Sequence, residues 1–286
     1  MSRSFSMATK RVLAIHDLCS FGRCSLTAAI PVISAMGAQV CPFPTAIFSN
    51  NFTYGDFTFS DFSSKMSTFM DKWQKLGLTY DCIYSGFLAD IGQIEIVKEA
   101  IARFARLNSK NVLVVVDPAM GDDGALYPTL NSEFVTHMRA LTKEADVITP
   151  NYTEACLLLD QPYNSTAPDH DTLQNICRTL ASGHQKQKVV ITSVPAEEGQ
   201  IKVACYDAET GAYHDFSTPR IPFATCGTGD LFTSVLTGAM LQGKSLNEAV
   251  LLAMKFVSLA IDYTYKSGSD YREGVQVEPC LKHLFD

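Results

Sequence analysis

Short apolar runs alternate with longer helical patterns along this sequence. The short runs, rich in β-branched residues, predict strands at residues 11–15, 40–43, 82–85, 111–116, 146–149 and 188–192. The clearest run is Val-Leu-Val-Val-Val at 112–116, and such a continuous apolar run is typical of a strand covered on both faces. Residues 200–207 and 213–217 flank Ala-Glu-Thr-Gly at 208–211, which predicts a β-hairpin.

Helices are predicted where apolar residues recur every three or four positions. One stripe consists of Leu26, Ala29, Ile30 and Ile33, and Gly37 is expected to end that helix. A second helix is predicted from an N-cap at Ser60 to Gly77, with a buried stripe of Phe62, Met66, Phe69, Trp73 and Leu76. Further helices are predicted around residues 94–104, 229–242 and 246–263.

This order of elements predicts an α/β fold with a central, mostly parallel sheet and helices on both faces. No linker rich in Pro, Gly or Ser divides the chain, so residues 11–286 are expected to form one domain. Residues 1–10 are expected to be a flexible N-terminal extension. In such folds ligands bind beyond the carboxyl ends of the strands.

Four of the predicted strands end in polar, Gly or Pro residues. These ends are His16-Asp17, Asp117-Pro118, Thr149-Pro150-Asn151 and Thr192-Ser193. A solvated loop explains any one of them, but four at the same edge of a sheet indicate a binding site. His16 is interpreted as a loop residue without a catalytic role.

The strongest single motif is Gly227-Thr228-Gly229-Asp230, at the start of a predicted helix. Glycines let the backbone approach a ligand closely, and the helix N-terminus favours an anion there. Asp230 beside such an anion site is placed to take a proton from an attacking hydroxyl group. The alternative is that Asp230 only caps a helix after a flexible turn. A dinucleotide fingerprint is disfavoured because it belongs near the start of a βαβ unit.

Composition narrows the class of protein. The formal net charge is −7 and no basic stripe occurs, so nucleic acid is a poor candidate partner. The nine cysteines include no CxxC pair and are interpreted as free thiols of a reducing compartment, here the cytoplasm. No secretory signal or membrane-spanning run is recognised in the sequence. Asp117 and Glu154, which follow strands, are the preferred candidates for Mg²⁺ ligands.

Taken together, these segments resemble the ribokinase superfamily and, within it, the pyridoxal kinase branch. The resemblance runs from about residue 11 to about residue 265. It rests on the following segments, in chain order: 12–15 with Gly22, Phe48-Ser49-Asn50 with Tyr54-Gly55, Ser85-Gly86-Phe87, Asp117-Pro118-Ala119-Met120-Gly121-Asp122, Thr149-Pro150-Asn151 with Glu154, and 224–230. It implies a ribokinase-like three-layer fold and ATP-dependent phosphorylation of the hydroxymethyl group of pyridoxal, pyridoxamine or pyridoxine.

The resemblance also implies residue roles. Asp230 would be the base, with Gly227, Thr228 and Gly229 forming the anion hole. The residues implied at the ATP site are Asn151, Thr192, Ser193, Tyr127 and Cys226. The residues implied at the substrate pocket are Asp17, Phe48, Phe52 and Phe87. Asp117 and Glu154 would organise Mg²⁺, with a monovalent cation such as K⁺ as a further candidate, and relatives are usually homodimers.

The departures from the family pattern lie mostly on the substrate side. The branch often has Ser, Thr and Tyr where this chain has Asp17, Phe52 and Phe87, and the superfamily has Asp where this chain has Ala224. A hydroxymethylpyrimidine kinase of the same fold therefore stays open, as does a non-catalytic vitamin-binding protein. For Cys226, packing in the nucleotide pocket is preferred over attack on an aldehyde substrate.

Overall fold

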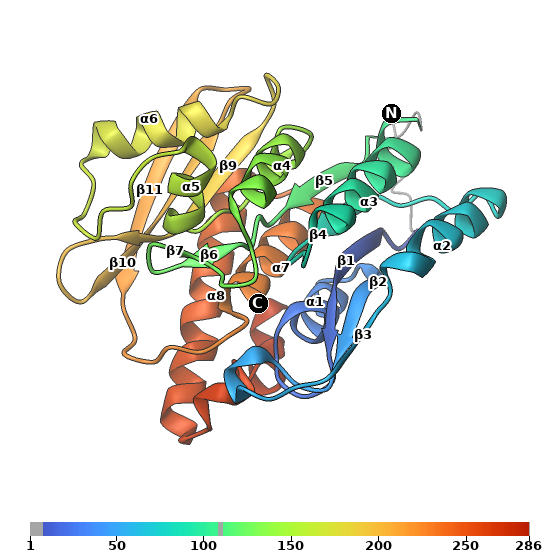
Figure 1. Ribbon diagram of the computed structural model, residues 1–286. Coiled ribbons are helices and arrows are strands. Elements are labelled where there is room, and N and C mark those ends of the chain that lie inside the picture. Colours follow the sequence, from blue (N-terminus) through green and yellow to red (C-terminus); the bar gives the residue numbers. More distant parts are fainter. Residues whose placement is uncertain (1–7, 108–110, 286) are drawn as a thin grey trace, which may run out of the picture.

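The computed structural model describes residues 8–107 and 111–285 (Figure 1). Most of the expected N-terminal extension, residues 1–7, lies outside the described residues. The strands are β1 (Arg11–Cys19), β2 (Gln39–Phe48), β3 (Phe59–Asp61), β4 (Cys82–Ser85), β5 (Leu113–Val116), β6 (Gly121–Asp122), β7 (Ala125–Leu126), β8 (Val147–Ile148), β9 (Lys188–Pro195), β10 (Gln200–Asp207) and β11 (Ala212–Pro219). The α-helices are α1 (Ser25–Ala35), α2 (Ser63–Lys75), α3 (Ile91–Ile101), α4 (Ser132–Thr142), α5 (Tyr152–Leu159), α6 (His170–Leu180), α7 (Thr228–Leu241) and α8 (Leu246–Ser267).

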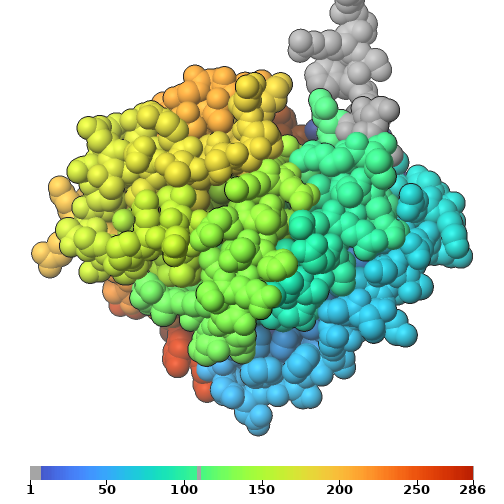
Figure 2. Space-filling model, turned by 45° about the horizontal axis from the view of Figure 1, so that its top comes forward, coloured from blue at the N-terminus to red at the C-terminus, as the bar shows by residue number. Residues whose placement is uncertain are grey.

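One nine-stranded sheet, in the order β11-β10-β9-β8-β5-β4-β1-β2-β3, forms the middle layer. The strands from β9 across to β2 run parallel, while β3 at one edge and β10 and β11 at the other are antiparallel. The predicted hairpin is β10 and β11. Figure 2 shows the chain from about residue 50 to 80 (blue to cyan) at one end and α6 with β10 and β11 at the other.

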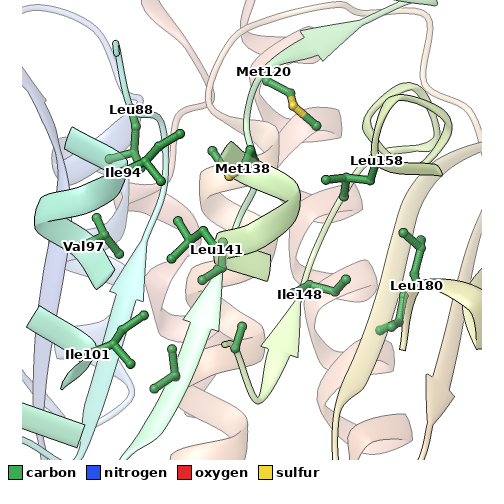
Figure 3. Close-up of a cluster of buried hydrophobic side chains, with 14 of the residues drawn as sticks. Leu88, Ile94, Val97, Ile101, Met120, Met138, Leu141, Ile148, Leu158 and Leu180 are labelled. Atoms are coloured by element: carbon green, nitrogen blue, oxygen red, sulfur yellow. The ribbon is translucent and has the colours of Figure 1, made fainter. Parts of the chain in front are cut away.

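Successive side chains of the central strands point to opposite faces of the sheet, so a large hydrophobic cluster lies on each face. On β1, Leu13 and Ile15 join the cluster under α2 to α6, whereas Val12 joins the cluster under α1, α7 and α8. Figure 3 shows part of the first cluster, where Ile94, Val97 and Ile101 of α3 and Met138 and Leu141 of α4 cover the sheet. Both faces of the parallel strands are therefore buried, as the continuous apolar runs predict.

The strand order reverses beside β1, and this reversal places the site. From β1 the chain crosses to β2 on one side, while β4 pairs with the other side of β1. At such a switch point the crossover connections leave in opposite directions and open a crevice beyond the carboxyl ends of the strands. The N-terminus of α7 comes to the same edge, because Ser25 at the start of α1 donates its N–H to Asp230 in the first turn of α7.

Three local predictions are wrong. Ser60 lies in β3 rather than at a helix N-cap, and α2 begins at Ser63 after an N-cap at Phe62. Of the stripe predicted for that helix, Met66 is buried as expected, but Phe69 and Leu76 are exposed and Met70 is buried in their place, since α2 covers only the margin of the sheet. His16 does not lie in a loop, because β1 continues to Cys19 through an irregularity between His16 and Leu18.

Candidate active site

Asp230 lies in the first turn of α7 with its carboxylate facing the β1–α1 segment. Its Oδ2 accepts the Ser25 N–H at 2.8 Å, and its side chain keeps 16% exposure. Burial raises the pKa of Asp230, and the hydrogen bond from Ser25 opposes that rise. The carboxylate is therefore held in one orientation, with a basicity above that of an exposed aspartate, as proton acceptance requires.

Ser25 also holds the second carboxylate of this region. Its hydroxyl donates to Asp17 Oδ1 at 2.6 Å, so one residue joins Asp17 to Asp230. Ser25 has a φ of 51°, in the left-handed region that a serine rarely occupies, and such strain is concentrated at functional sites. Burial raises the pKa of Asp17 to about 7, with a smaller contribution from the charge of Asp230. Nothing in the sequence pattern singles out Ser25.

His16 lies beneath Asp230, fully buried in β1. Its Nδ1 is 3.7 Å from Asp230 Oδ1, and its ring meets that of Tyr84 edge-on at 4.3 Å between centroids. Burial lowers the pKa of His16 to about 3, so the imidazole is neutral at neutral pH. Within the described ranges neither ring nitrogen has a hydrogen-bond partner. His16 is a site residue that sequence reasoning dismissed.

Asp117 follows β5 and is joined to α7 and to β8 by hydroxyl groups. The Thr233 hydroxyl is 3.1 Å from Asp117 Oδ2 and 3.0 Å from the Thr149 hydroxyl. Burial, and then the charge of Asp230, raise the pKa of Asp117 to about 8. Thr233 was missed in the sequence, although it lies three residues after Asp230 and so on the same helix face.

Glu154 and Asn151 form a capping box at the start of α5. Asn151 Oδ1 accepts the Glu154 N–H at 2.9 Å, and Glu154 Oε2 accepts the Asn151 N–H at 2.7 Å. Glu154 Oε1 also accepts the Met120 N–H at 3.0 Å. Burial, and then the charge of Asp117, still raise the pKa of Glu154. Thr192 pairs with Asn151 across the sheet edge, and Ser193 beside it has a φ of 54°.

The glycine motif abuts the β1–α1 segment directly. Gly227 is the N-cap of α7, with a φ of 83°. A Cβ atom at Gly227 would lie 2.1 Å from the Arg23 carbonyl oxygen, so only glycine fits. A Cβ atom at Gly229 would have Asp117 Oδ2 as its nearest neighbour, at 3.9 Å. Thr228 and Gly229 open α7, whose free N–H groups favour an anion beside Asp230.

A row of aromatic rings borders the site, from the end of β2 to the residue that follows β7. Phe48 ends β2 and contacts Phe52 at 5.1 Å between ring centroids. Phe52 lies 6.1 Å from Phe87, which lies 6.3 Å from Tyr127. The structure thus brings together the three aromatic residues predicted for the substrate pocket and the tyrosine predicted for ATP. Phe52 is half exposed, so this row is open to solvent.

A short C-terminal segment ties three loops of the site together. Its main-chain carbonyl groups accept hydrogen bonds from Asn51 Nδ2 (2.7 Å, to Arg272) and from the Thr225 hydroxyl (2.6 Å, to Tyr271). The carbonyl of Glu273 accepts the Arg23 N–H at 2.9 Å. Asn51 Nδ2 also lies 3.3 Å from Cys226 Sγ. Residues 271–273, called the strap below, therefore position the substrate-side loops and the glycine loop.

The residues present fit a divalent cation with phosphate oxygens. Asp117 and Glu154 are buried, the charge of Asp117 raises the pKa of Glu154, and among the ion pairs of residues 8–107 and 111–285 none joins either to Lys or Arg. No group of three or more His, Cys, Asp or Glu in the same ranges could hold a metal ion by itself. Mg²⁺ usually takes only one or two carboxylates and completes its shell with phosphate and water.

Comparison with known proteins decides the family. The sequence pattern of the family described as phosphomethylpyrimidine kinase matches residues 22–274. This chain belongs to that family. A candidate phosphomethylpyrimidine kinase from Bacteroides thetaiotaomicron is 40% identical, with a TM-score of 0.93 over 99% of this chain and 96% of that one. A second crystal form of the Bacteroides protein contains pyridoxal.

Two further relatives carry the name pyridoxal kinase. The structure of the Lactobacillus plantarum enzyme is 30% identical, with a TM-score of 0.88 over 97% of each chain. A candidate pyridoxal kinase of Schizosaccharomyces pombe is 28% identical over 85% of this chain and 77% of its own length. The ribokinase-like α/β fold and the pyridoxal kinase branch expected from the motifs are confirmed.

Proposed function

We propose that this protein transfers the γ-phosphoryl group of ATP to the hydroxymethyl group of a B6 vitamer, giving the 5′-phosphate and ADP. One observation carries the proposal above the others. The Asp230 carboxylate lies in the first turn of α7, oriented by Ser25, next to a loop in which only glycine fits at position 227. A base beside an anion site is what transfer from a phosphate to an alcohol needs.

The chemistry divides between Asp230 and the start of α7. Asp230 accepts the proton of the hydroxymethyl group as its oxygen attacks the γ-phosphorus. The N–H groups of Gly227, Thr228 and Gly229, at the positive end of α7, stabilise negative charge on the transferred group. Neutral His16 fills the space beneath Asp230 without pairing with it as an ion, which leaves the carboxylate basic.

The cation and nucleotide belong on the other side of Asp230. Asp117 and Glu154 would hold Mg²⁺, directly or through water, and the ion would neutralise charge on the phosphate oxygens. The hydrogen bonds of Glu154 to main-chain N–H groups fix its carboxylate beside Asp117. Residues proposed to contact ATP are Asn151, Thr192, Ser193, Tyr127 and Cys226. A monovalent cation such as K⁺ is proposed as a further component.

A pyridine substrate fits the side of the site formed by β1, β2 and β4. Phe48, Phe52 and Phe87 provide an aromatic row for a flat ring, and Asp17 provides a polar group at its margin. The pyridoxal in the Bacteroides crystal form supports a B6 vitamer for this chain. The family description favours hydroxymethylpyrimidine as the second candidate, since that ring has the same size and carries the same group.

The proposal also covers the domain organisation, the oligomeric state and the location of the protein. We propose a single domain over residues 11–286, supported by the one nine-stranded sheet and by the packing of α7 and α8 in the core on one of its faces. A homodimer in the cytoplasm is proposed from the branch and from cysteines that are all free in the described chain. No helix of residues 8–107 and 111–285 is long and apolar enough to cross a membrane.

The first prediction tests the base and the substrate together. ADP release is measured with Mg-ATP and, separately, pyridoxal, pyridoxamine, pyridoxine and hydroxymethylpyrimidine. Turnover is expected with at least one vitamer, and Asp230→Asn should lower kcat by about 10² to 10⁴ because the proton acceptor is lost. Asp262→Asn, an exposed aspartate on α8 paired with Lys266, is the matched control and should retain activity.

Three outcomes contradict parts of the proposal. An Asp230→Asn enzyme within tenfold of wild type removes Asp230 as the base. Turnover of hydroxymethylpyrimidine alone replaces the vitamer with the second candidate. Tight pyridoxal binding in calorimetry without ADP release from any substrate identifies a vitamin-binding protein instead of an enzyme.

A further inference from the structure

Three thiols gather where the β1–α1 segment meets the glycine loop. Cys19 ends β1 and Cys24 is the N-cap of α1, and both are buried in a small cluster with Ala46 and Phe48. Cys226, the residue before Gly227, packs against this cluster and is only partly buried. The kinase chemistry proposed above uses none of these sulfur atoms as a reacting group.

The backbones that carry Cys24 and Cys226 are close enough for a covalent link. A Cβ atom at Gly227 would lie 3.2 Å from the Cα of Cys24. Cys226 is the residue directly before Gly227, about 3.8 Å away along the chain, so its backbone lies beside that of Cys24. The side chains are also close, since Cys226 packs against the cluster that contains Cys19 and Cys24, and the Cys24 thiol is near enough to lower the pKa of Cys226.

The two thiols differ in the way that a reactive and a resolving cysteine differ. Cys226 stands at the N-terminal end of α7 and lies 3.3 Å from the amide Nδ2 of Asn51. The hydrogen bond with Cys24 lowers the pKa of Cys226, against smaller opposing effects of burial and of Asp230. The pKa of Cys24 is raised, first by its hydrogen bonds with Cys19 and Cys226 and then by burial.

The remaining thiols lack these features. In each of them burial is the first cause of a raised pKa; they are Cys41, Cys82, Cys156, Cys177, Cys205 and Cys280. A buried protonated thiol reacts slowly with oxidants, because the thiolate is the nucleophile. Cys226 therefore combines partial exposure, a stabilised thiolate and an adjacent second thiol.

We propose that Cys24 and Cys226 form a peroxide-sensitive pair that closes to a disulfide across the active site. The Cys226 thiolate attacks one oxygen of a hydroperoxide, the O–O bond breaks, and Cys226 becomes a sulfenic acid as water or an alcohol leaves. The Cys24 sulfur then attacks that sulfenic sulfur, and the S–O bond breaks as a second water leaves. The two thiols lose two electrons and two protons, and one hydroperoxide is reduced.

Formation of the Cys24–Cys226 disulfide would shift the residues that orient Asp230. An S–S bond is about 2.05 Å long, so two thiols in hydrogen-bond contact must move together by more than 1 Å. Cys24 directly precedes Ser25, which orients Asp230, and Cys226 directly precedes the glycine loop. A shift of this size at a catalytic geometry costs up to about 10²-fold in rate. This loss of turnover rests on the proposed kinase function, whereas the disulfide itself does not.

Two measurements distinguish formation of the disulfide from the loss of turnover that it is expected to cause. The full chain, reduced and freed of reductant, is treated with a small excess of hydrogen peroxide and digested without reduction. Tandem mass spectrometry is expected to find the peptide of Cys24 linked to that of Cys226, and dithiothreitol should release it. The link should disappear in the Cys24→Ser and Cys226→Ser variants and persist in Cys156→Ser. It should also persist in Cys41→Ser, a control that is needed because Cys41 and Cys24 lie in the same tryptic peptide.

Activity is compared as the ratio of oxidised to reduced turnover within each variant. The ratio should be about 0.1 or less for wild type, recover with dithiothreitol, and stay near 1 for Cys24→Ser. A Cys19–Cys24 link, or Cys226 oxidised to sulfinic acid without any link, overturns the proposal. A complete Cys24–Cys226 link with full turnover overturns the inhibition. A reduced protein inactive on all four substrates refutes the kinase proposal, while the peptide map still decides the disulfide.

Discussion

At the scale of residues, this site consists of largely buried carboxylates that form no ion pair with any Lys or Arg of residues 8–107 and 111–285. Asp17 and Asp117 both have raised pKa values, first because of burial and then through the charge of Asp230. Hydroxyl and main-chain donors hold each of them in place instead of Lys or Arg. In the proposed mechanism, the positive charge that balances these carboxylates would be that of the Mg²⁺ ion bound with ATP.

Gly86 offers a test at the same scale. A Cβ atom there would lie 2.2 Å from His16 Nδ1 and 2.3 Å from its Cε1, so the buried ring must move. Gly86→Ala is expected to lower the free energy of unfolding by about 1 to 3 kcal/mol, as overpacking does. It should also lower kcat, because the same ring nitrogen, His16 Nδ1, lies 3.7 Å from Asp230 Oδ1.

The control for this prediction removes the ring that causes the clash. Urea unfolding of Gly86→Ala, His16→Ala and the double variant gives the coupling between the two positions. The double variant should be more stable than the sum of the single losses predicts. Additive losses would show that His16 does not limit the space at Gly86.

At the scale of elements, the strap explains how loops from three parts of the chain keep one geometry. The segment that follows β2, the loop before α7 and the β1–α1 segment all donate hydrogen bonds to carbonyl groups of residues 271–273. Arg272 also stacks on Tyr54 at 4.8 Å, which fastens the 3-10 turn of Phe52–Tyr54 to the strap. Loops fixed this way lose less entropy on binding substrate.

Asn51 is the main link between that turn and the strap. Its Nδ2 donates to the Arg272 carbonyl, and its Oδ1 accepts the Thr53 N–H at 3.1 Å. Asn51→Ala should raise the KM for the vitamer about tenfold and leave the KM for ATP within twofold, because the freed loop carries Phe52. Steady-state kinetics in both substrates measure the difference.

A second asparagine separates this effect from general destabilisation. Asn131 caps α4 through the Phe134 N–H at 3.0 Å, and α4 carries none of the proposed site residues. Asn131→Ala should cost about 1 kcal/mol of stability without changing either KM. If Asn51→Ala raised both KM values equally, the strap would not act on the substrate side.

At the scale of the whole molecule, buried carboxylates make stability depend on pH. Asp17 keeps its proton up to about pH 7 in the folded chain, whereas the unfolded chain releases it near the ordinary value of 3.8. Between these values the folded state binds more protons. The free energy of unfolding therefore falls as pH rises, by up to about 1.4 kcal/mol per pH unit for one group.

Asp17→Asn tests this linkage. Because asparagine does not titrate, the variant should gain stability relative to wild type as pH rises from 5 to 7, and the difference should level off above about pH 8. Urea midpoints at unit steps of pH measure it, and Asp17→Ser, which also lacks the carboxyl group, should show the same loss of slope. Parallel curves for wild type and both variants would contradict the assigned burial effect.

The sequence by itself determined the α/β class, most of the central strands and the family, because these follow from local pattern and from motifs in a fixed order. It also placed Asp117, Thr149, Thr192 and the glycine motif, since parallel strands bring their carboxyl ends to one edge. The sequence motifs therefore identified Asp230 as the candidate base without the tertiary structure.

Only the tertiary structure decided which neighbours control those residues. Ser25, His16, Thr233 and the strap act through contacts between segments that are distant in the chain; Ser25 and Asp230 are 205 residues apart, and Asn51 and Arg272 are 221 apart. The continuation of β1 past His16 depends on pairing with β2, and the exposure of Phe69 depends on where α2 meets the sheet. The periodicity of apolar residues predicts which face of a helix or strand is hydrophobic. Whether a side chain is buried, how its pKa shifts and which thiols lie together depend on the segments that pack against that face in the folded chain.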